Sequence, residues 1–200
     1  MRIVTFYTPR YAGEVEPWVE SIRATGIPYH ITIVDEQGSW RKNVGMKPQF
    51  MLDCLLLFKE PLLWIDIDGR VQGSLHDLGF AQLQYDFGAW FIPWDQMNAR
   101  DRPGGAKTKN DGISSGTMFW NYTPAAIEFL ALWIAAEDGQ HRYGQIVLGE
   151  VWHAHDPASS FRTWKMPQAW FKVFDRPWKR GESGPIIIEH FQASRRLRRG

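Results

Sequence analysis

Short apolar runs rich in β-forming residues alternate with helix-like runs along most of this chain. The strand-like runs cover residues 3–7, 30–34, 62–65, 87–91, 117–120 and 186–188, and the helix-like runs cover residues 14–24, 47–59, 124–136 and 145–152. Such alternation favours helices on both faces of a mostly parallel sheet. We therefore predict one three-layer α/β/α sandwich over residues 1–200, a length that can bury a sizeable core.

Prolines mark the ends of two predicted helices. Pro48 stands in the first turn of one helix, where no backbone N–H is needed, and Pro61 follows its end. Thr123 and Pro124 supply a capping hydroxyl and a first-position proline for the other. These signals predict where both helices begin.

Positive charge is concentrated at the end of the chain. Residues 161–200 carry ten Lys or Arg against three acids, a net +7, while the whole chain has a net charge of +1. This distribution suits an anion such as a diphosphate or a nucleic-acid backbone. For residues 196–200, a solvated basic tail is the alternative.

The sequence favours a reducing, cytoplasmic setting. Cys54 is the single cysteine and lies in an apolar helical pattern, so disulfides are excluded and thiol chemistry is not expected. The longest apolar stretch, 127–136, is too short to cross a bilayer, and the N-terminus lacks the layout of a cleavable signal. We expect no membrane span.

Two acids follow the apolar strand 62–65 directly. Asp66 and Asp68 would point to opposite faces of a continuing strand, but a strand end and a turn at Gly69 would aim both at one cation. Carboxylate ligands suit Mg²⁺ or Mn²⁺, and such an ion would act as a Lewis acid on pyrophosphate oxygens. We predict a divalent-metal site here; the alternative is a loop with two solvated acids.

The same segment also resembles the nucleophile loop of haloacid-dehalogenase-like phosphatases, in which the first acid, here Asp66, attacks phosphate. That mechanism needs a later Lys and a second acidic cluster after another strand. No Asp-Asp or Gly-Asp-x-x-x-Asp pair follows a later strand, and Arg70 stands where that family has a small hydroxyl or apolar residue. The phosphatase remains an alternative.

Four segments occur in an order typical of one enzyme family. They are a helix start with Trp40, Asn43, Lys47, Pro48 and Phe50, then LLWIDIDGRV at 62–71, ISSGTMFWNYTP at 113–124, and PIIIEHFQASR at 185–195. Their order and spacing resemble glycosyltransferases of the nucleotide-diphospho-sugar transferase superfamily, from about residue 3 to 195. The resemblance implies the Rossmann-like glycosyltransferase-A fold, a nucleotide-diphosphate sugar as donor, and Mn²⁺ or Mg²⁺ as cofactor.

The resemblance also implies roles for individual residues. The donor would contact Tyr7, Thr8, Asn43, Lys47, Ser114, Ser115 and Gly116. The last segment lacks the His-x-x-Gly-x-x-Lys-Pro-Trp form of retaining galactosyl- and glucosyltransferase relatives, so Arg195 or Arg196 would supply positive charge for the diphosphate instead. Tyr7 and Thr8 fall where the family binds base and ribose. The metal would be held by Asp66, Asp68 and His190, since neutral imidazole is a reasonable ligand for Mn²⁺; a structural histidine is the alternative at 190.

No residue stands out as a catalytic base. Relatives often have Asp-Gln where this chain has Gly144-Gln145, so Gln145 is left to face the sugar without the acid. Asp111, Glu150 and Asp156 are the candidate carboxylates for deprotonating an acceptor in an inverting transfer, and a retaining transfer needs none.

The acceptor is not named by the sequence. A glycan, a protein, a lipid-linked sugar and a modified DNA base all remain open, and the basic end with many aromatics is compatible with DNA. The polar segment 93–112 lacks periodicity and is expected to be a flexible lid. A non-catalytic sugar- or nucleic-acid-binding domain is the second class of hypothesis.

Overall fold

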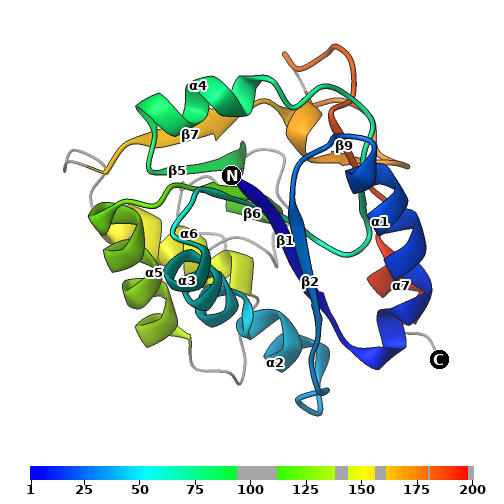
Figure 1. Ribbon diagram of the computed structural model, residues 1–200, viewed down its shortest axis with the longest axis horizontal. Coiled ribbons are helices and arrows are strands. Elements are labelled where there is room, and N and C mark those ends of the chain that lie inside the picture. Colours follow the sequence, from blue (N-terminus) through cyan, green and yellow to red (C-terminus); the bar gives the residue numbers. More distant parts are fainter. Residues whose placement is uncertain (94–111, 138–143, 156–160, 180, 198–200) are drawn as a thin grey trace.

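A six-stranded sheet forms the centre of the molecule, as seen in the computed structural model, which describes residues 1–93, 112–137, 144–155, 161–179 and 181–197 (Figure 1). Its strands run in the order β2-β1-β3-β6-β5-β7. Their bounds are β1 Arg2–Tyr7, β2 Tyr29–Ile33, β3 Leu62–Ile65, β5 Phe87–Ile92, β6 Gly112–Trp120 and β7 Thr163–Met166. Only β6 runs against its neighbours β3 and β5, whereas the other pairings are parallel. The predicted mostly parallel α/β sheet is confirmed.

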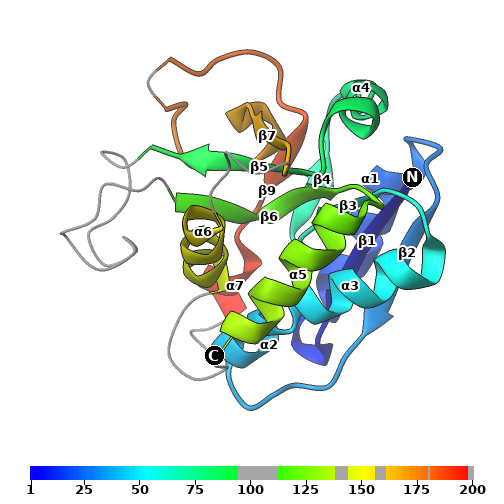
Figure 2. The same cartoon turned by 90° about the vertical axis from the view of Figure 1, so that its left-hand side faces the viewer.

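Helices cover both faces of this sheet (Figures 1 and 2). One face packs against α3 Lys47–Phe58, α5 Pro124–Ala136 and α6 Gly144–Ala154, and the other against α1 Val15–Arg23 and α4 Asp77–Gln84. Neighbouring strand residues divide between the two cores: Val4 and Trp64 face the first, Ile3 and Leu63 the second. The two cores make the three layers that the alternating pattern predicts.

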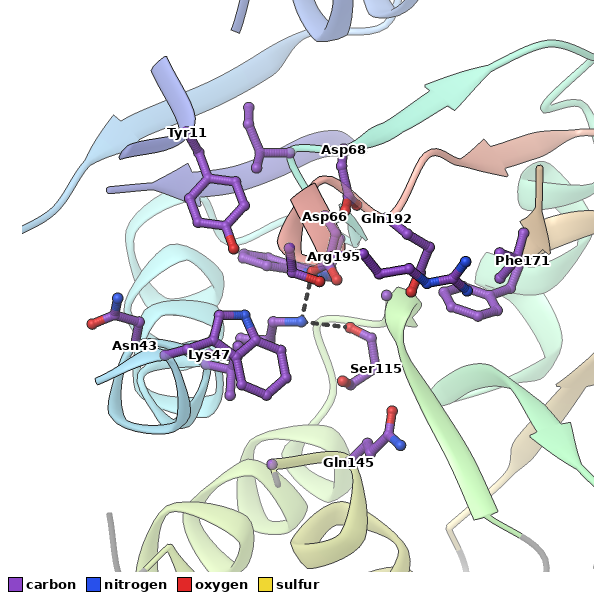
Figure 3. A pocket seen from close by; sticks show the side chains of 18 of the residues that line it. Tyr11, Asn43, Lys47, Asp66, Asp68, Ser115, Gln145, Phe171, Gln192 and Arg195 are labelled. Carbon is purple, nitrogen blue, oxygen red and sulfur yellow. Dashed lines mark hydrogen bonds and ion pairs between the residues drawn. The ribbon is translucent and has the colours of Figure 1, made fainter. Parts of the chain in front are cut away.

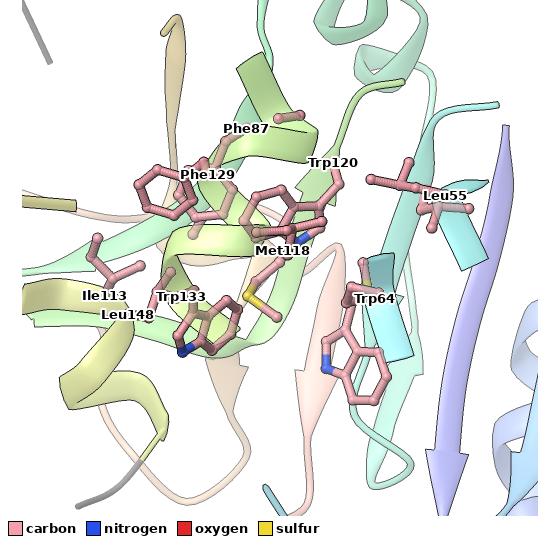
Figure 4. Packing of buried hydrophobic residues seen from close by; sticks show 14 of the residues in the cluster. Leu55, Trp64, Phe87, Ile113, Met118, Trp120, Phe129, Trp133 and Leu148 are labelled. Atoms are coloured by element: carbon pink, nitrogen blue, oxygen red, sulfur yellow. The ribbon is translucent and has the colours of Figure 1, made fainter. Parts of the chain in front are cut away.

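Aromatic side chains fill much of the core. Figure 4 shows Trp64, Phe87, Trp120, Phe129 and Trp133 packed together, and the Phe87 and Trp120 ring centroids are 4.5 Å apart. The chain has 11 tryptophans, and several of them therefore serve packing.

A second, three-stranded sheet lies beside the main one. It consists of β4 Gly69–Val71, β9 Ile188–His190 and β8 Lys172–Val173, in the order β4-β9-β8. The strand predicted at 186–188 thus begins two residues later and belongs to this small sheet. Strands of two or three residues are too short to show alternation, so this sheet left little pattern in the sequence.

The helix-end signals behave as predicted. Thr123 Oγ1 accepts a hydrogen bond from Ala126 N at 3.2 Å, and Pro124 opens α5. Pro48 lies in the first turn of α3, which ends at Phe58 ahead of Pro61. Cys54 is a free, buried thiol in α3, and burial raises its pKa to about 12, which keeps it protonated.

Two expectations about irregular segments change. Gly112 already belongs to β6, which is longer than the predicted strand 117–120; residues 94–111 of the expected lid lie outside the described part of the chain. Arg196 and Leu197, expected to open a basic tail, form the end of helix α7, Ala193–Leu197. None of the helices in the described ranges combines the length and apolar character needed to cross a membrane.

Candidate active site

A cavity of about 450 Å³ opens where β1 and β3 end. Because these strands are parallel neighbours, the residues that follow them meet at one edge of the sheet. The sequence-predicted residues that line the cavity are Tyr7, Thr8, Asn43, Lys47, Asp66, Asp68, Ser115, Gly116, Gln145 and Arg195 (Figure 3). They come from six separate stretches of the chain, so the fold gathers most of the predicted set in one place.

Asp66, Asp68 and His190 form a group that could bind a metal ion. Each offers a ligand atom, and these atoms lie within 4.8 Å of one another. The turn that brings the two acids together is closed by Gly69 N, which donates to Asp66 O at 2.7 Å. The predicted turn at Gly69 therefore places both carboxylates toward one centre.

His190 has an unused ring nitrogen in this group. Its side chain is 1% exposed, and its Nδ1 lies 3.6 Å from Asp68 Oδ1 without a hydrogen-bond partner among the described residues. Its Nε2 lies 2.9 Å from Thr117 Oγ1. In the tautomer with its proton on Nε2, donated to Thr117 Oγ1, Nδ1 would offer a lone pair beside two carboxylates, which is the chemistry of a metal ligand.

Close packing around His190 leaves no room for a side chain at two neighbouring glycines, Gly69 and Gly116. A Cβ at Gly69 or at Gly116 would lie 3.1 Å from His190 Cε1, and one at Gly116 would also lie 2.2 Å from Phe171 Cε2. Burial and these close walls fix the imidazole in place. The close neighbours that require glycine at position 116 are thus Phe171 and His190. The family resemblance places Gly116 next to the donor sugar, which is a separate contact.

The two carboxylates differ in their electrostatic environment. Burial raises the pKa of Asp66; the Lys47 ammonium opposes this and the Asp68 charge adds to it, so the net direction is upward. Burial also raises the pKa of Asp68, but the facing His190 and the backbone N–H of Ala193 outweigh it, so the pKa of Asp68 lies below its usual value. Asp68 is therefore the more firmly ionised of the pair.

Lys47 is a buried residue of the cavity lining. Its Nζ donates to Asp66 Oδ1 at 2.6 Å and to Ser115 O at 3.1 Å, as the dashed lines in Figure 3 show. Trp64 Nε1 donates to the same Asp66 oxygen at 2.7 Å, which leaves Oδ2 as the oxygen of Asp66 with the greater capacity for a cation.

The remaining predicted residues lie elsewhere. Ser114 is 1% exposed and its Oγ accepts from Gly116 N, so it supports β6 from within and does not line the cavity. Glu150 is on α6, away from the cavity lining. Asp111 and Asp156 are outside the described residues.

Several cavity residues were not found by sequence reasoning. They are Tyr11, Trp40, Trp90, Gln168, Phe171, Arg176, Lys179 and Gln192, among others. Trp40 is part of the segment that carried the family resemblance and could have been nominated from it. Gln192 also lies in such a segment, 185–195, and Arg176 and Lys179 belong to the basic segment 161–200, but none of them was singled out. Tyr11, Trp90, Gln168 and Phe171 carry no local pattern that separates them from packing or surface residues.

No protein-family model matches the sequence, and no curated protein sequence matches it. Several solved structures, however, match the fold of this chain over nearly its whole length. A glycosyltransferase involved in the glycosylation of the major capsid of PBCV-1 superposes with a TM-score of 0.62 at 14% identity, covering 99% of this chain and 97% of that one. The galactosyltransferase LgtC, in complex with donor and acceptor sugar analogs, gives 0.58 at 14% identity, covering 96% and 87%. The bifunctional glycosyltransferase WbbM gives 0.58 at 12% identity, covering 96% of this chain and 45% of that one. The chain has the glycosyltransferase-A fold.

Proposed function

We propose that this chain transfers a sugar from a nucleotide-diphosphate donor to an acceptor hydroxyl, with Mn²⁺ or Mg²⁺ held by Asp66, Asp68 and His190. The observation that carries the proposal is the buried Nδ1 of His190, which has no hydrogen-bond partner in the described part of the chain and lies beside two carboxylates of the cavity lining. Two hard oxygen donors with one imidazole fit Mn²⁺ well. The ion would neutralise charge that develops on the departing diphosphate.

Cations along the cavity suit the diphosphate. Lys47 lies beside Asp66, and Arg195 reaches the cavity from α7 while its Nη1 pairs with Asp175 at 2.6 Å. In this proposal the guanidinium of Arg195 and the ammonium of Lys47 would bind phosphate oxygens of the donor.

The nucleoside and sugar ends are assigned by position. Tyr7, Thr8 and Asn43 would surround the nucleoside, where Thr8 Oγ1 already donates to Glu36 Oε1 at 3.3 Å. Ser115, Gly116 and Gln145 would face the sugar. Structural likeness to LgtC, whose structure holds sugar analogs, supports a sugar donor.

The phosphatase alternative is less well supported. The Asp66, Asp68 and His190 group is the sole candidate metal cluster in the described ranges. A phosphatase of that type would need a second acidic cluster. A glycan, a protein or a modified DNA base remains open as acceptor.

The metal assignment predicts the effect of two substitutions. Asp66→Ala or Asp68→Ala should abolish Mn²⁺-dependent release of the nucleoside diphosphate, because each removes a ligand that places the ion against the leaving group. The measurement is nucleoside-diphosphate release from the sugar nucleotide that best stabilises the wild-type protein.

Asp53→Ala is the matched control. Asp53 is an exposed carboxylate on α3, hydrogen-bonded to Gln49, and its loss should leave turnover unchanged. Wild-type turnover in either cavity mutant would overturn the metal assignment. Donor binding that survives chelation, with no donor consumed, would instead favour the binding-domain hypothesis.

A further inference from the structure

The carboxylate of Glu14 lies outside the cavity lining and connects two parts of the molecule. One is the loop of residues 66–70, which carries Asp66 and Asp68 and is called the metal loop below; the other is the last helix, α7. Glu14, at the end of η1 Pro9–Glu14, is 8% exposed. Its Oε2 accepts from Arg70 Nη2 at 2.6 Å, and its Oε1 accepts from Arg196 Nη2. A buried carboxylate shared by two guanidiniums is a costly arrangement unless all three charges are held in place.

The Arg70 branch leads into the loop that carries the acids. Arg70 Nη1 donates to Ile67 O and to Gly69 O, each at 2.8 Å, so the guanidinium folds back over the turn between and after Asp66 and Asp68. The side chain of Arg70 is 10% exposed, and Glu14 supplies its counter-charge. Glu14 therefore anchors the backbone of the predicted metal loop.

The Arg196 branch leads into the C-terminal helix that touches the same acids. Arg196 lies in α7, whose first residue donates from Ala193 N to Asp68 Oδ2 at 2.9 Å. Just before the helix, Phe191 N donates to Asp68 O at 2.9 Å. Arg195, between these contacts and Arg196, lines the cavity.

The two branches meet again at Phe191. The Arg70 guanidinium carbon lies 5.8 Å from the centroid of the Phe191 ring, so the side chain that braces the loop also contacts the segment entering α7. Figure 1 shows α7 close to the start of α1, where Glu14 is placed, and contacts between α7 and η1 are present. The metal loop, the first turn of the chain after β1 and the C-terminal helix form one connected unit.

From these contacts we infer that Glu14 is a positioning residue: it docks the C-terminal helix against the metal loop and thereby sets the geometry of Asp68 and of Arg195. The inference rests on the proposed function in assigning Asp68 to a metal. Glu14 is not among the residues that line the cavity, so it would act through Arg70 and Arg196 and not by contact with the ion or the donor. Mutation of residues that orient a metal ligand without touching the metal commonly lowers metal affinity about 10–100-fold.

The test of docking is hydrogen exchange of the amides of Phe191 and Ala193, both bonded to Asp68. Arg196→Ala cuts only the exposed branch, since the Arg196 side chain is 72% exposed, and leaves Glu14 paired with Arg70. Both amides should exchange at least about tenfold faster, while amides of β1 and β3 keep wild-type rates. Arg23→Ala, an exposed arginine at the end of α1, is the matched control and should change neither amide.

The test of the metal link is direct Mn²⁺ titration without any donor. Arg196→Ala and Glu14→Gln should bind Mn²⁺ about tenfold more weakly than wild type, and Arg196→Lys should recover part of the loss. Glu14→Gln leaves the buried Arg70 without its counter-charge and is compared only if its unfolding transition stays cooperative.

Hydrogen exchange and Mn²⁺ titration together distinguish failure of the positioning role from failure of the proposed function. Unchanged exchange of both amides in Arg196→Ala, or wild-type Mn²⁺ affinity in that folded variant, would overturn the positioning role. A wild-type protein that binds no Mn²⁺ would instead overturn the proposed function, and the exchange measurement would still decide whether Glu14 docks the helix.

Discussion

Two glycines determine how closely the cavity walls approach the buried imidazole. A side chain at Gly116 would collide with the Phe171 ring at 2.2 Å, and one at Gly69 would collide with Ile65 Cγ2 at 2.6 Å. Both positions also face His190. At this scale a single methyl group tests whether the imidazole must stay where it is.

We expect Gly116→Ala to lower the free energy of unfolding by about 1–3 kcal/mol, because the added methyl overfills a packed site and displaces Phe171. Mn²⁺ affinity should fall with it, since His190 is the other neighbour of the new atom. Urea unfolding and Mn²⁺ titration measure the two effects.

Gly79→Ala is the control for Gly116. Gly79 is on α4, and a Cβ there meets nothing within 4 Å, so this change should stabilise the protein by up to about 1 kcal/mol. Equal, small effects of the two substitutions would contradict the packing argument.

Asp86 lies directly before β5 and connects three elements there. Because β5 runs in the same direction as β3, this is the edge of the sheet opposite the cavity. The side chain is 3% exposed; its Oδ2 accepts from Arg162 N at 2.8 Å and its Oδ1 from Thr123 Oγ1 at 2.9 Å. It thus joins the start of β5, the cap of α5 and the segment entering β7. Burial raises the pKa of Asp86, but hydrogen bonds and charge from Arg162 outweigh it, so the pKa lies below its usual value.

We expect Asp86→Asn to cost about 2–4 kcal/mol at neutral pH, because several charge-assisted hydrogen bonds converge on one buried carboxylate. Urea unfolding at pH 7 measures the loss, with Asp53→Asn as an exposed control that should be nearly neutral.

The same group predicts a pH dependence. Since the folded-state pKa of Asp86 is lowered, its contribution is complete above the unfolded-state pKa of about 4 and is lost as the pH falls below that value. The stability difference between wild type and Asp86→Asn should therefore shrink between pH 5 and about pH 2. A difference that stays constant over this range would contradict the assignment.

For the whole molecule, ligand binding at the cavity should be visible as stability. A nucleoside diphosphate with Mn²⁺ at about 100 times its Kd adds about 2.7 kcal/mol, which for 200 residues raises Tm by about 5–10 °C. The shift should vanish on chelation, because in the proposed function the diphosphate binds through an ion that Asp66 and Asp68 would hold.

Comparing nucleotides in this thermal-shift measurement also identifies the base, and comparing sugar nucleotides identifies the donor. The Asp68→Ala variant should show no Mn²⁺-dependent shift. An equal shift with and without the ion would contradict a metal-bridged donor.

Local patterns in the sequence predicted the elements that local forces form. The strand expected at 62–65 is β3 Leu62–Ile65, and the helix expected at 47–59 is α3 Lys47–Phe58, because apolar periodicity and flanking prolines act within a few residues. The antiparallel direction of β6 and the small sheet β4-β9-β8 were not predicted, because strand pairing depends on which distant segments pack together. Cavity residues such as Phe171 and Arg176 were missed for the same reason, because packing of distant segments brings them to the cavity.

The sequence by itself determined the α/β layering and placed two acids and a glycine directly after a buried strand, since both follow from side-chain order along a short stretch. The family resemblance named His190 as a third ligand, but only the tertiary structure decided which groups face those acids. Pairing of β4 with β9 sets Gly69 opposite His190, and α7 brings Ala193 N to Asp68, across 125 residues of sequence. Contacts at such separations are fixed by the packing of the whole chain, which no local pattern encodes.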